Sequence, residues 1–409
     1  MSEWKTYKLG DFITHKKGFA FKSDFYKDTG SPIIRVTNFT GNSISMDDIL
    51  FIDMDQKINF KEVEIKEGDI IIATVGSWPN NPSSIVGRVI KVPRVASGTL
   101  LNQNAVIIYP NTNLDKKFLY YLLKEKNFSN YLVGGAQGSA NQASIKLEQI
   151  YNYEFSAPED KAQQQEIAQI LTSLDDKIEL NLQMNQTLEA MAQALFKEWC
   201  WVEGGIVPEG WTWKKLLDIA DVSSSKRIFR DEYILKGVPF YRGKEVTQLS
   251  NGEAISTELF ISEERYAEIK EKFGVPQIGD ILITSVGTIG SVWLVDNDAP
   301  FYFKDGNVTW IKDYKTAING EFVYQWLQTK EAKEQIKSVT IGSTQQALTI
   351  SALRGLNILI PDNETVSNVC IQLEKINAKR INNLNQIQSL TQTRDALLPK
   401  LMSGKLELV

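Results

Sequence analysis

The stretch QQQEIAQILTSLDDKIELNLQMNQTLEAMAQALFKEW, residues 163–199, decides the fold. It lies in a segment without Gly or Pro and is rich in Gln, Glu, Leu, Ala and Met, which lose little side-chain freedom in a helix. One face of this helix would form a seam with a second helix, because its residues recur at steps of three and four, broken only at Asn181. These residues are Ile167, Leu171, Leu174, Ile178, Asn185, Leu188, Ala192 and Leu195. A helix over residues 159–199 would be roughly 60 Å long, which is too long to be buried within one domain. We therefore predict that it is a spacer.

A second segment without Gly or Pro, residues 362–398, offers a partner for this seam. Matching residues recur 203 positions apart: Ile178 with Ile381, Leu195 with Leu398, and Lys197 with Lys400. We therefore interpret the two helices as equivalent parts of an internal duplication and predict that they pair antiparallel as a coiled coil. The alternative is two independent amphipathic helices, each packed on its own domain.

The segments that flank the helices also repeat. The apolar run Ile70–Val75 follows Gly68-Asp69, and Ile281–Val286 follows Gly279-Asp280 at an offset of 211. Such runs predict buried strands, and the fold class is α/β of the α+β type. The predicted order is a globular domain at 1–157, a spacer helix at 158–203, a second similar domain at 204–360 and a C-terminal spacer helix at 361–409.

Composition limits the class of protein. The chain has 409 residues, of which 43% are apolar, so it has room for two or three domains with proper cores. Two cysteines, Cys200 and Cys370, favour a reducing compartment, and the first residues carry no apolar run, so we expect a cytoplasmic protein. The net charge of −5 argues against nucleic acid, but residues 158–203 alone hold nine acidic and three basic residues. The flanking domains are therefore near neutral.

Catalytic motifs are absent from the sequence. His15 is the only histidine, so the chain offers no repeated His-based triad and no zinc-ligand spacing. No phosphate-binding loop motif occurs, and Gly134–Gly138 follows a predicted helix, where a dinucleotide loop would follow a strand. We interpret the acidic pairs Asp47-Asp48 and Asp175-Asp176 as solvated surface charges. The sequence therefore predicts no catalysis and no metal site in this chain.

Polar and basic side chains in loops are the remaining candidates for function. Asn and Gln match the donor and acceptor pattern of adenine, whereas Arg and Lys match guanine or phosphate. Any one of these residues is well explained as a solvated loop residue, but the polar loops recur at matching places in both halves. The candidate DNA-binding residues are Lys22, Arg35, Ser77, Trp78, Asn80, Asn81, Arg94, Gln137, Asn141 and Gln142 in the first half, and Arg227, Arg230, Arg242, Thr288, Lys304, Thr344, Gln345 and Gln346 in the second.

The chain resembles the specificity subunit of a type I restriction-modification system over essentially its whole length. The matching motifs are Trp4…Leu9-Gly10-Asp11, Pro32-Ile33-Ile34-Arg35, Gly68-Asp69-Ile70-Ile71-Ile72, Gln103-Asn104, Gln164-Gln165-Glu166-Ile167-Ala168, Leu174-Asp175-Asp176-Lys177-Ile178-Glu179 and Gly342-Ser343-Thr344-Gln345. The second helix lacks the Gln-Glu-Ile-Ala and Leu-Asp-Asp-Lys-Ile motifs of the first helix. Ser139-Ala140-Asn141-Gln142 also departs from the Gly-Ser-Thr-Gln pattern.

The resemblance implies a non-catalytic DNA-binding subunit with two target recognition domains, each for one half of a bipartite site. The implied partners are double-stranded DNA, two adenine methyltransferase subunits and translocase/nuclease subunits, in a system for DNA methylation and host defence. S-adenosylmethionine, ATP and Mg would serve those partner subunits, and this chain would need no cofactor. The helices would set the unread gap. The polar residues Asn181 and Asn185, with Gln388 at the equivalent place in the second helix, either fix the helix register by pairing polar groups or mark a locally hydrated gap in the seam.

Two alternatives remain open at the level of sequence. One is a coiled-coil scaffold that binds proteins and no DNA, which the overall acidity favours. The other is an enzyme with an unrecognised site, which the missing motifs disfavour.

Overall fold

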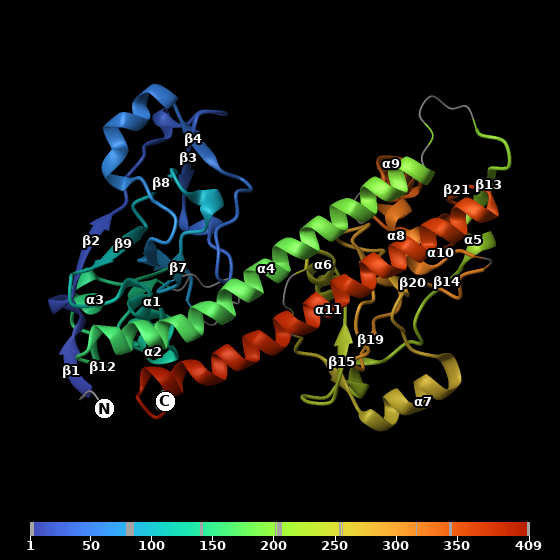
Figure 1. Ribbon diagram of the computed structural model, residues 1–409. Helices are drawn as coiled ribbons and strands as arrows, with labels where there is room; N and C mark the ends of the chain where they lie inside the picture. Colours follow the sequence, from blue (N-terminus) through green and yellow to red (C-terminus); the bar gives the residue numbers. More distant parts are fainter. Residues whose placement is uncertain are drawn as a thin grey trace. The chain divides into compact units, whose positions relative to one another are not determined.

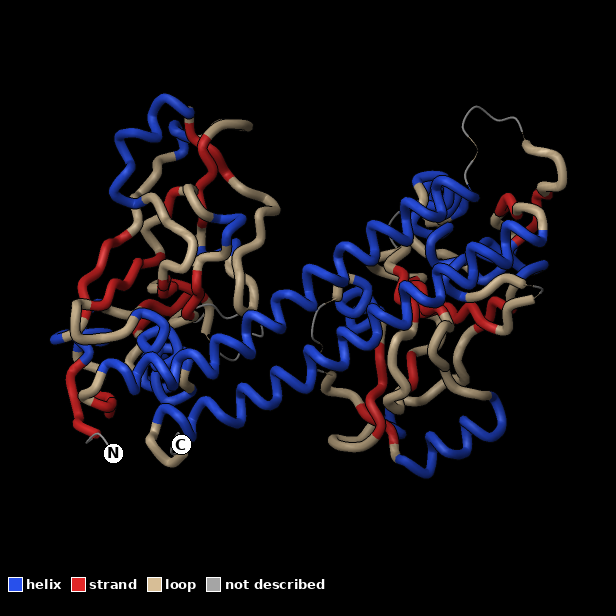
Figure 2. The backbone as a smooth tube through the Cα atoms, viewed as in Figure 1, coloured by secondary structure: helices blue, strands red, loops and turns tan. Residues whose placement is uncertain are grey.

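A computed structural model describes residues 4–78, 86–139, 142–200, 202, 207–252, 255, 257–315, 317–342 and 346–406. The chain forms two compact units. The first comprises Met1–Glu179 with Gln388–Val409, and the second comprises Leu180–Ile387. Each unit contains one mixed α/β domain and parts of two long helices, α4 (Lys161–Cys200) and α11 (Asn363–Met402), which Figures 1 and 2 draw as continuous helices. The predicted α/β domains and long helices are confirmed.

Among the described residues, the first domain has four sheets, three of which recur in the second domain with the same strand order. Its elements are β1 (Trp4–Lys8), η1 (Leu9–Asp11), β2 (Ile13–Lys17), η2 (Ser23–Phe25), β3 (Ser31–Ile34), η3 (Val36–Asn38), β4 (Leu50–Ile52), η4 (Met54–Val63), β5 (Ile70–Ala73), β6 (Val75–Gly76), β7 (Val89–Lys91), η5 (Arg94–Ala96), β8 (Leu100–Leu101), β9 (Ala105–Pro110), α1 (Lys116–Lys124), α2 (Lys126–Gly134), β10 (Gln137–Ser139), β11 (Gln142–Ser144), α3 (Leu147–Tyr151) and β12 (Glu154–Pro158). The recurring sheets have the strand orders β2-β9-β5-β7, β4-β3-β8 and β1-β12, and the additional sheet is β10-β11-β6.

The second domain repeats this plan. Its elements are β13 (Thr212–Lys215), α5 (Leu216–Ile219), β14 (Asp221–Ser223), η6 (Arg230–Glu232), β15 (Val238–Tyr241), α6 (Gly243–Ser250), β16 (Phe260–Ile261), α7 (Glu263–Phe273), β17 (Ile281–Thr284), β18 (Val292–Leu294), β19 (Tyr302–Phe303), β20 (Val308–Lys312), α8 (Gly320–Gln328), α9 (Lys330–Val339), α10 (Ile350–Arg354) and β21 (Asn357–Ile360). The strand orders β14-β20-β17-β18, β16-β15-β19 and β13-β21 match those of the first domain one for one. The internal duplication is thereby confirmed at the level of topology.

The central strands β5 and β17 are buried on both faces. Ile70 and Ile72 face the core that includes the long helices, whereas Ile71 and Ala73 face a second core. Side chains alternate across a strand, so a strand between two cores reads as a continuous apolar run. The Gly-Asp turn before each strand is also shared. Gly68 and Gly279 both adopt positive φ, and the following aspartate accepts a bond from a backbone N–H three residues earlier, at 2.9 Å in the first unit and 2.8 Å in the second.

Within the first unit, α4 and α11 contact each other through apolar residues. Ile167, Ala168 and Leu171 of α4 lie in one core with Leu401 and Met402 of α11. The start of α4 therefore packs against the end of α11, as the antiparallel prediction requires.

Within the second unit the same antiparallel pairing holds, but polar residues join it. Ala192 and Phe196 of α4 share a core with Val369 and Leu373 of α11. Further along, the side-chain bonds between the two helices are Asn181 Nδ2 to Gln386 Oε1 at 3.2 Å, Asn383 Nδ2 to Asn185 Oδ1 at 2.9 Å and Asn185 Nδ2 to the Arg380 carbonyl at 3.4 Å. The expectation of polar groups inside the seam is met by these residues.

The partner named for those asparagines was wrong. Gln388 is exposed, and Asn383 and Gln386 take the place assigned to it. In an antiparallel pair, residue numbers increase along one helix while they decrease along the facing helix. A residue that is equivalent in the duplication is therefore not the residue that faces its counterpart.

Two local features of the first domain differ from what the sequence pattern predicts. Residues 116–127, with Phe118, Tyr121 and Leu122 on one helical face, predict a single helix, but the structure has two, α1 and α2, because Glu125 adopts an extended conformation between them. The polar stretch 134–142 predicts a flexible loop, but it contains β10 and the start of β11. Small polar residues such as Gly138 and Ser139 carry no apolar alternation, so neither strand has a sequence signature.

Candidate nucleic-acid interface

Two segments that are distant in the sequence meet beyond β5 in the first unit. β6 pairs antiparallel with β11, which in turn pairs with β10. Trp78 follows β6, and its indole N–H donates to the Ser139 carbonyl at 2.7 Å. Ser77 and Trp78, which follow β6, therefore lie beside the β10–β11 hairpin, on which Gln137 and Gln142 are both exposed. Gly138 permits this close pairing, because a Cβ there would lie 2.0 Å from the Gln142 carbonyl oxygen.

The second unit brings together the equivalent segments beyond β17. Val286 and Ile341 each form a β-bridge with Ala347, and the Leu348 N–H donates to the Ser285 carbonyl at 2.8 Å. Thr288 and Gln346 are exposed beside these bridges. The Thr284 hydroxyl donates to the Thr288 carbonyl and accepts from the Ser291 N–H at 2.9 Å, so the strand end shapes the turn that carries Thr288.

Five candidates lie outside the described residues. They are Asn80, Asn81, Asn141, Thr344 and Gln345.

Basic residues of the second unit gather at the same ends of β15 and β19. These strands pair in parallel, with Tyr241 opposite Phe303, so Arg242 and Lys304 follow them side by side. The Lys304 N–H donates to the Tyr241 carbonyl at 2.8 Å.

Two more predicted arginines join this group. Arg227 forms an ion pair with Asp305 at 2.9 Å and remains 67% exposed. Arg230 joins through Tyr233, whose N–H donates to the Arg230 carbonyl at 3.3 Å and whose ring lies 5.3 Å from that of Phe240 in β15. All four predicted basic residues of the second unit thus share one region.

Arg242 has a structural partner that limits what it can bind. Its guanidinium lies 2.9 Å from Oε1 of Glu245, which is fully buried, and its backbone N–H donates to Oε2 at 2.8 Å. The side chain of Arg242 is 37% exposed, so part of the guanidinium still faces solvent. A buried carboxylate needs such a partner, and Arg242 therefore serves the fold first.

The basic residues of the first unit are more scattered. Arg35 follows β3, where its guanidinium donates to the Asp48 carbonyl at 3.0 Å, and Lys22 is exposed at the start of η2. Arg94 lies at the other end of β5, because Ser97 of the same turn accepts from the Glu67 N–H at 3.1 Å just before that strand. The structure therefore does not place Arg94 with Trp78 and the hairpin.

Two exposed aromatic residues were not among the predicted site residues. Phe229 is 59% exposed between Arg227 and Arg230, and Phe19 is 41% exposed with its carbonyl bonded to the Gln103 N–H. Basic residues interleaved with aromatics are typical of nucleic-acid surfaces, since an aromatic ring offers a face for stacking. The run Lys226-Arg227-Ile228-Phe229-Arg230 carried that signal in the sequence.

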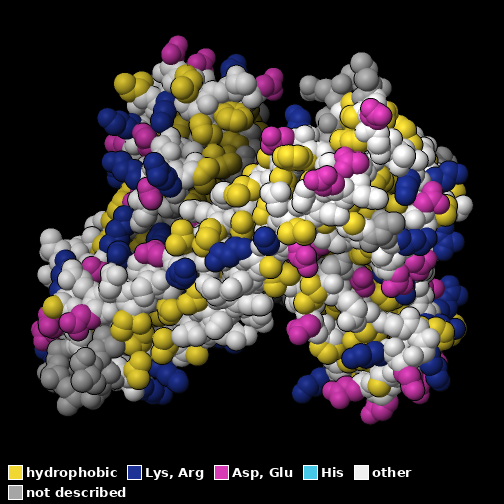
Figure 3. Space-filling view, turned by 45° about the vertical axis from the view of Figure 1, so that its right-hand side comes forward, with side chains coloured by type: hydrophobic (Ala, Val, Ile, Leu, Met, Phe, Trp, Pro, Cys, Tyr) yellow, Lys and Arg dark blue, Asp and Glu magenta, His cyan; other side chains and the backbone are white. Residues whose placement is uncertain are grey.

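Charge alone does not mark a binding face. On the side drawn in Figure 3, acidic and basic side chains are mixed over both units. Among the described residues, no group of three or more His, Cys, Asp or Glu is arranged to hold a metal ion. His15 instead lies with its Nδ1 2.7 Å from the Tyr151 hydroxyl. The arrangement suits recognition by amide, hydroxyl and guanidinium groups.

Comparison with known proteins identifies the family. The family described as the type I restriction modification DNA specificity domain matches residues 1–190 and 208–400. The chain belongs to this family. Its description names DNA specificity, in agreement with the prediction that the chain has no catalysis of its own.

Relatives match over most of their length. The type I restriction enzyme MjaIX specificity subunit of Methanocaldococcus jannaschii is 29% identical, with 85% of this chain and 82% of that protein covered. The HindI specificity subunit of Haemophilus influenzae is 24% identical over 99% of this chain and all of that protein. The solved S subunit of a type I restriction-modification system from M. genitalium has the same fold, with a TM-score of 0.59 at 17% identity and coverage of 100% and 97%. Within the described residues, no helix is both long and apolar enough to cross a membrane.

Proposed function

We propose that this chain is the DNA-reading subunit of a type I restriction-modification complex and that each unit reads one half of a bipartite site. One observation carries the proposal: two domains of the same strand order expose polar side chains at the same end of the same central strand. Membership of the DNA specificity family and the names of the relatives support it.

The chemistry of these side chains suits base edges. An amide of Gln137 or Gln142 presents a donor and an acceptor that match adenine in the major groove. Arg227, Arg230 and Lys304 offer positive groups for guanine or for phosphates, which position the protein without reading sequence. Two major-groove readers on one face of B-DNA lie about 34–36 Å apart, or a multiple of that, and the helix pair is the element that spans both units.

The catalytic work belongs to other subunits in this proposal. The acidic segment 158–203 keeps DNA phosphates away from the spacer and offers charge to basic partner surfaces. We propose two adenine methyltransferase subunits, with translocase/nuclease subunits in the restricting complex, assembled in the cytoplasm. S-adenosylmethionine, ATP and Mg would be bound by those subunits.

A competition experiment tests the proposal. The chain, purified with its methyltransferase partner, should bind one bipartite duplex at least about a thousandfold more tightly than a scrambled duplex at one fixed salt concentration. Equal affinity for both duplexes would reject specific recognition, and absent binding would favour a protein-binding scaffold.

Paired variants assign each half. Gln137→Ala with Gln142→Ala should weaken discrimination at one half-site, and Thr288→Ala with Gln346→Ala should do so at the other. Each pair is the matched control for the other. A change at both half-sites from one pair would contradict independent reading by the two units.

A further inference from the structure

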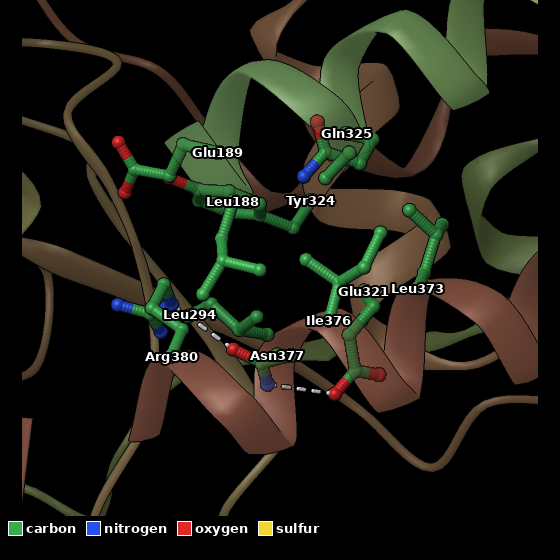
Figure 4. Close-up of a pocket in the computed structure, with 11 residues that line it drawn as sticks. Leu188, Glu189, Leu294, Glu321, Tyr324, Gln325, Leu373, Ile376, Asn377 and Arg380 are labelled. Atoms are coloured by element: carbon green, nitrogen blue, oxygen red, sulfur yellow. Dashed lines mark hydrogen bonds between the residues drawn. The ribbon is translucent and has the colours of Figure 1, made fainter. Parts of the chain in front are cut away.

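Arg380 of α11 joins the helix pair to the second domain. Its guanidinium lies 3.3 Å from Oδ2 of Asp296 in the loop after β18, and its Nε donates to Oδ1 of Asn377 at 3.1 Å. Asn377 Nδ2 donates in turn to Oε1 of Glu321 on α8 at 2.9 Å (Figure 4). Only 18% of the Arg380 side chain and 14% of the Asp296 side chain are exposed. Arg380 is thus linked to two elements of the domain. It contacts the loop after β18 directly at Asp296, and Asn377 connects it to α8.

The same turn of α11 also aligns the two helices. The Arg380 carbonyl accepts from Asn185 of α4, and Asn383, which is fully buried, donates to the same asparagine. Buried amides that bond across a seam favour one alignment, because any slip leaves polar groups without partners. The docking of the domain and the register of the helices therefore depend on one connected set of polar groups.

The first unit has a counterpart built from different residues. Arg394 of α11 lies 2.8 Å from Oδ1 of Asp175 on α4, and the Tyr121 hydroxyl of α1 donates to Oδ2 of the same carboxylate at 2.7 Å. The side chains of Arg394 and Asp175 are 16% and 18% exposed. The interpretation of Asp175 as a solvated surface charge was wrong.

These two sets differ from the apolar contacts around them. Apolar side chains tolerate small rotations of a domain about a helix, whereas a charged pair with little solvent loses much of its interaction when its geometry changes. In the second unit the close-up shows Leu188, Leu294 and Ile376 beside the polar residues, lining a small pocket (Figure 4). Apolar packing is therefore incomplete at this point, and the polar bonds add a restraint there.

We propose that the Arg380–Asp296 pair and the Tyr121–Asp175 bond, whose carboxylate Arg394 holds in place, fix the angle of each recognition domain about the helix pair and thereby restrict the gap accepted between the half-sites. The inference rests on the proposed function, in which two domains read one duplex. One additional base pair moves a half-site by about 3.4 Å and turns it by about 34–36°, so a domain held at one angle accepts one gap. Arg380 and Arg394 are positioning residues and need not touch DNA.

The first test measures the angle without DNA. Spin labels at Lys375→Cys on α11 and Glu271→Cys on α7, both exposed and both in the second unit, report the distance distribution by pulsed EPR of the full chain. Arg380→Gln and Asp296→Asn should each broaden that distribution. Arg354→Gln is the matched control, because Arg354 bonds to Val222 within the domain and should leave the distribution unchanged. An unchanged distribution in both test variants would overturn the proposal.

The second test uses the assembled complex with the methyltransferase. Duplexes carry the two half-sites with the native gap or with one base pair added or removed. The native chain should prefer the native gap by about tenfold or more, and Arg380→Gln and Arg394→Gln should reduce this preference severalfold while both half-sites are still required. Reversal of the pair, Arg380→Asp with Asp296→Arg, should restore part of it.

The outcomes separate the two proposals. If the native chain does not distinguish the bipartite site from scrambled DNA, the proposed function fails, and only the EPR distance distributions test whether Arg380 and Asp296 fix the domain angle. If the native chain requires both half-sites and the variants keep its gap preference unchanged, the proposal about the domain angle fails and the proposed function stands.

Discussion

The two domains use the same turn after β3 and after β15 but stabilise it with different chemistry. In the first unit, Asn38 caps the turn by accepting from the Arg35 N–H at 2.9 Å. In the second unit, Glu245 occupies the same place and accepts from the Arg242 N–H at 2.8 Å. The neutral Asn38 belongs to the short 3₁₀ turn η3, whereas the charged Glu245 lies in the first turn of the helix α6. The buried carboxylate of Glu245 also requires the guanidinium of Arg242 as a partner. Duplication preserved the bond geometry and left the charge free to diverge.

Removal of the two caps should have unequal effects. Glu245→Ala leaves the half-buried guanidinium of Arg242 without its partner and should lower the free energy of unfolding of the second unit by about 2–3 kcal/mol. Asn38→Ala removes two neutral hydrogen bonds and should cost the first unit about 1–2 kcal/mol. Hydrogen exchange followed by mass spectrometry reports each unit separately. Equal losses in the two units would show that the charge of Glu245 adds nothing.

Acid should distinguish the units for the same reason. Burial raises the pKa of Glu245, but its bonds to Arg242 outweigh burial and leave that pKa below its ordinary value of 4.5. A carboxyl whose pKa is lower in the folded state stabilises the fold above its unfolded pKa, and this stability is lost as the pH falls below 4.5. Asn38 does not titrate. Comparison of the native chain with Glu245→Gln between pH 6 and pH 3 should show a steeper loss in the native second unit, and parallel curves would contradict this assignment.

The Gly-Asp turns provide a smaller contrast. Asp69 pairs with Lys116 at 3.0 Å, whereas Asp280 accepts from the Trp310 indole at 2.9 Å. Burial raises the pKa of Asp280, so folding disfavours its ionised form and the associated stability is lost as the pH rises through the folded pKa. At pH 7, Asp69→Asn should lower the unfolding free energy by about 1 kcal/mol.

Asp280→Asn is the matched variant in the second unit, and it should change the unfolding free energy by less than about 0.5 kcal/mol because an amide oxygen also accepts from Trp310. Thermal denaturation of both variants checks the difference. A larger loss for Asp280→Asn would reverse the contrast.

The sequence predicted the features that depend on local pattern. The long helices follow from an apolar stripe without Gly or Pro, and β5 and β17 follow from apolar runs after a Gly-Asp turn. The pairing of the Trp78 segment with the Gln137–Ser144 hairpin was not predictable, because strands of three residues with small polar side chains carry no alternation. Arg94 resembles the other basic residues in sequence, and only the fold shows that it lies at the opposite strand end.

Long-range polar pairs were likewise not predictable from the sequence. The residues around Asp175 on α4 resemble those of a solvent-exposed helix face, and its partner Arg394 lies 219 positions away in the sequence. Likewise, the duplication suggested Gln388 for the seam, whereas the antiparallel direction selects Asn383 and Gln386. Periodicity identifies which residues face inward, and the direction of pairing decides which residues meet.

The central claim is that each unit independently reads half of one DNA site. Single-molecule sequencing of methylated adenines tests this most directly, in cells that carry the complete system with either the native chain or a chimera whose residues 1–157 come from another family member. The account predicts a bipartite motif for the native chain and, for the chimera, a motif altered in one half with the other half retained. A continuous motif, or a chimera whose two halves both change, would contradict it.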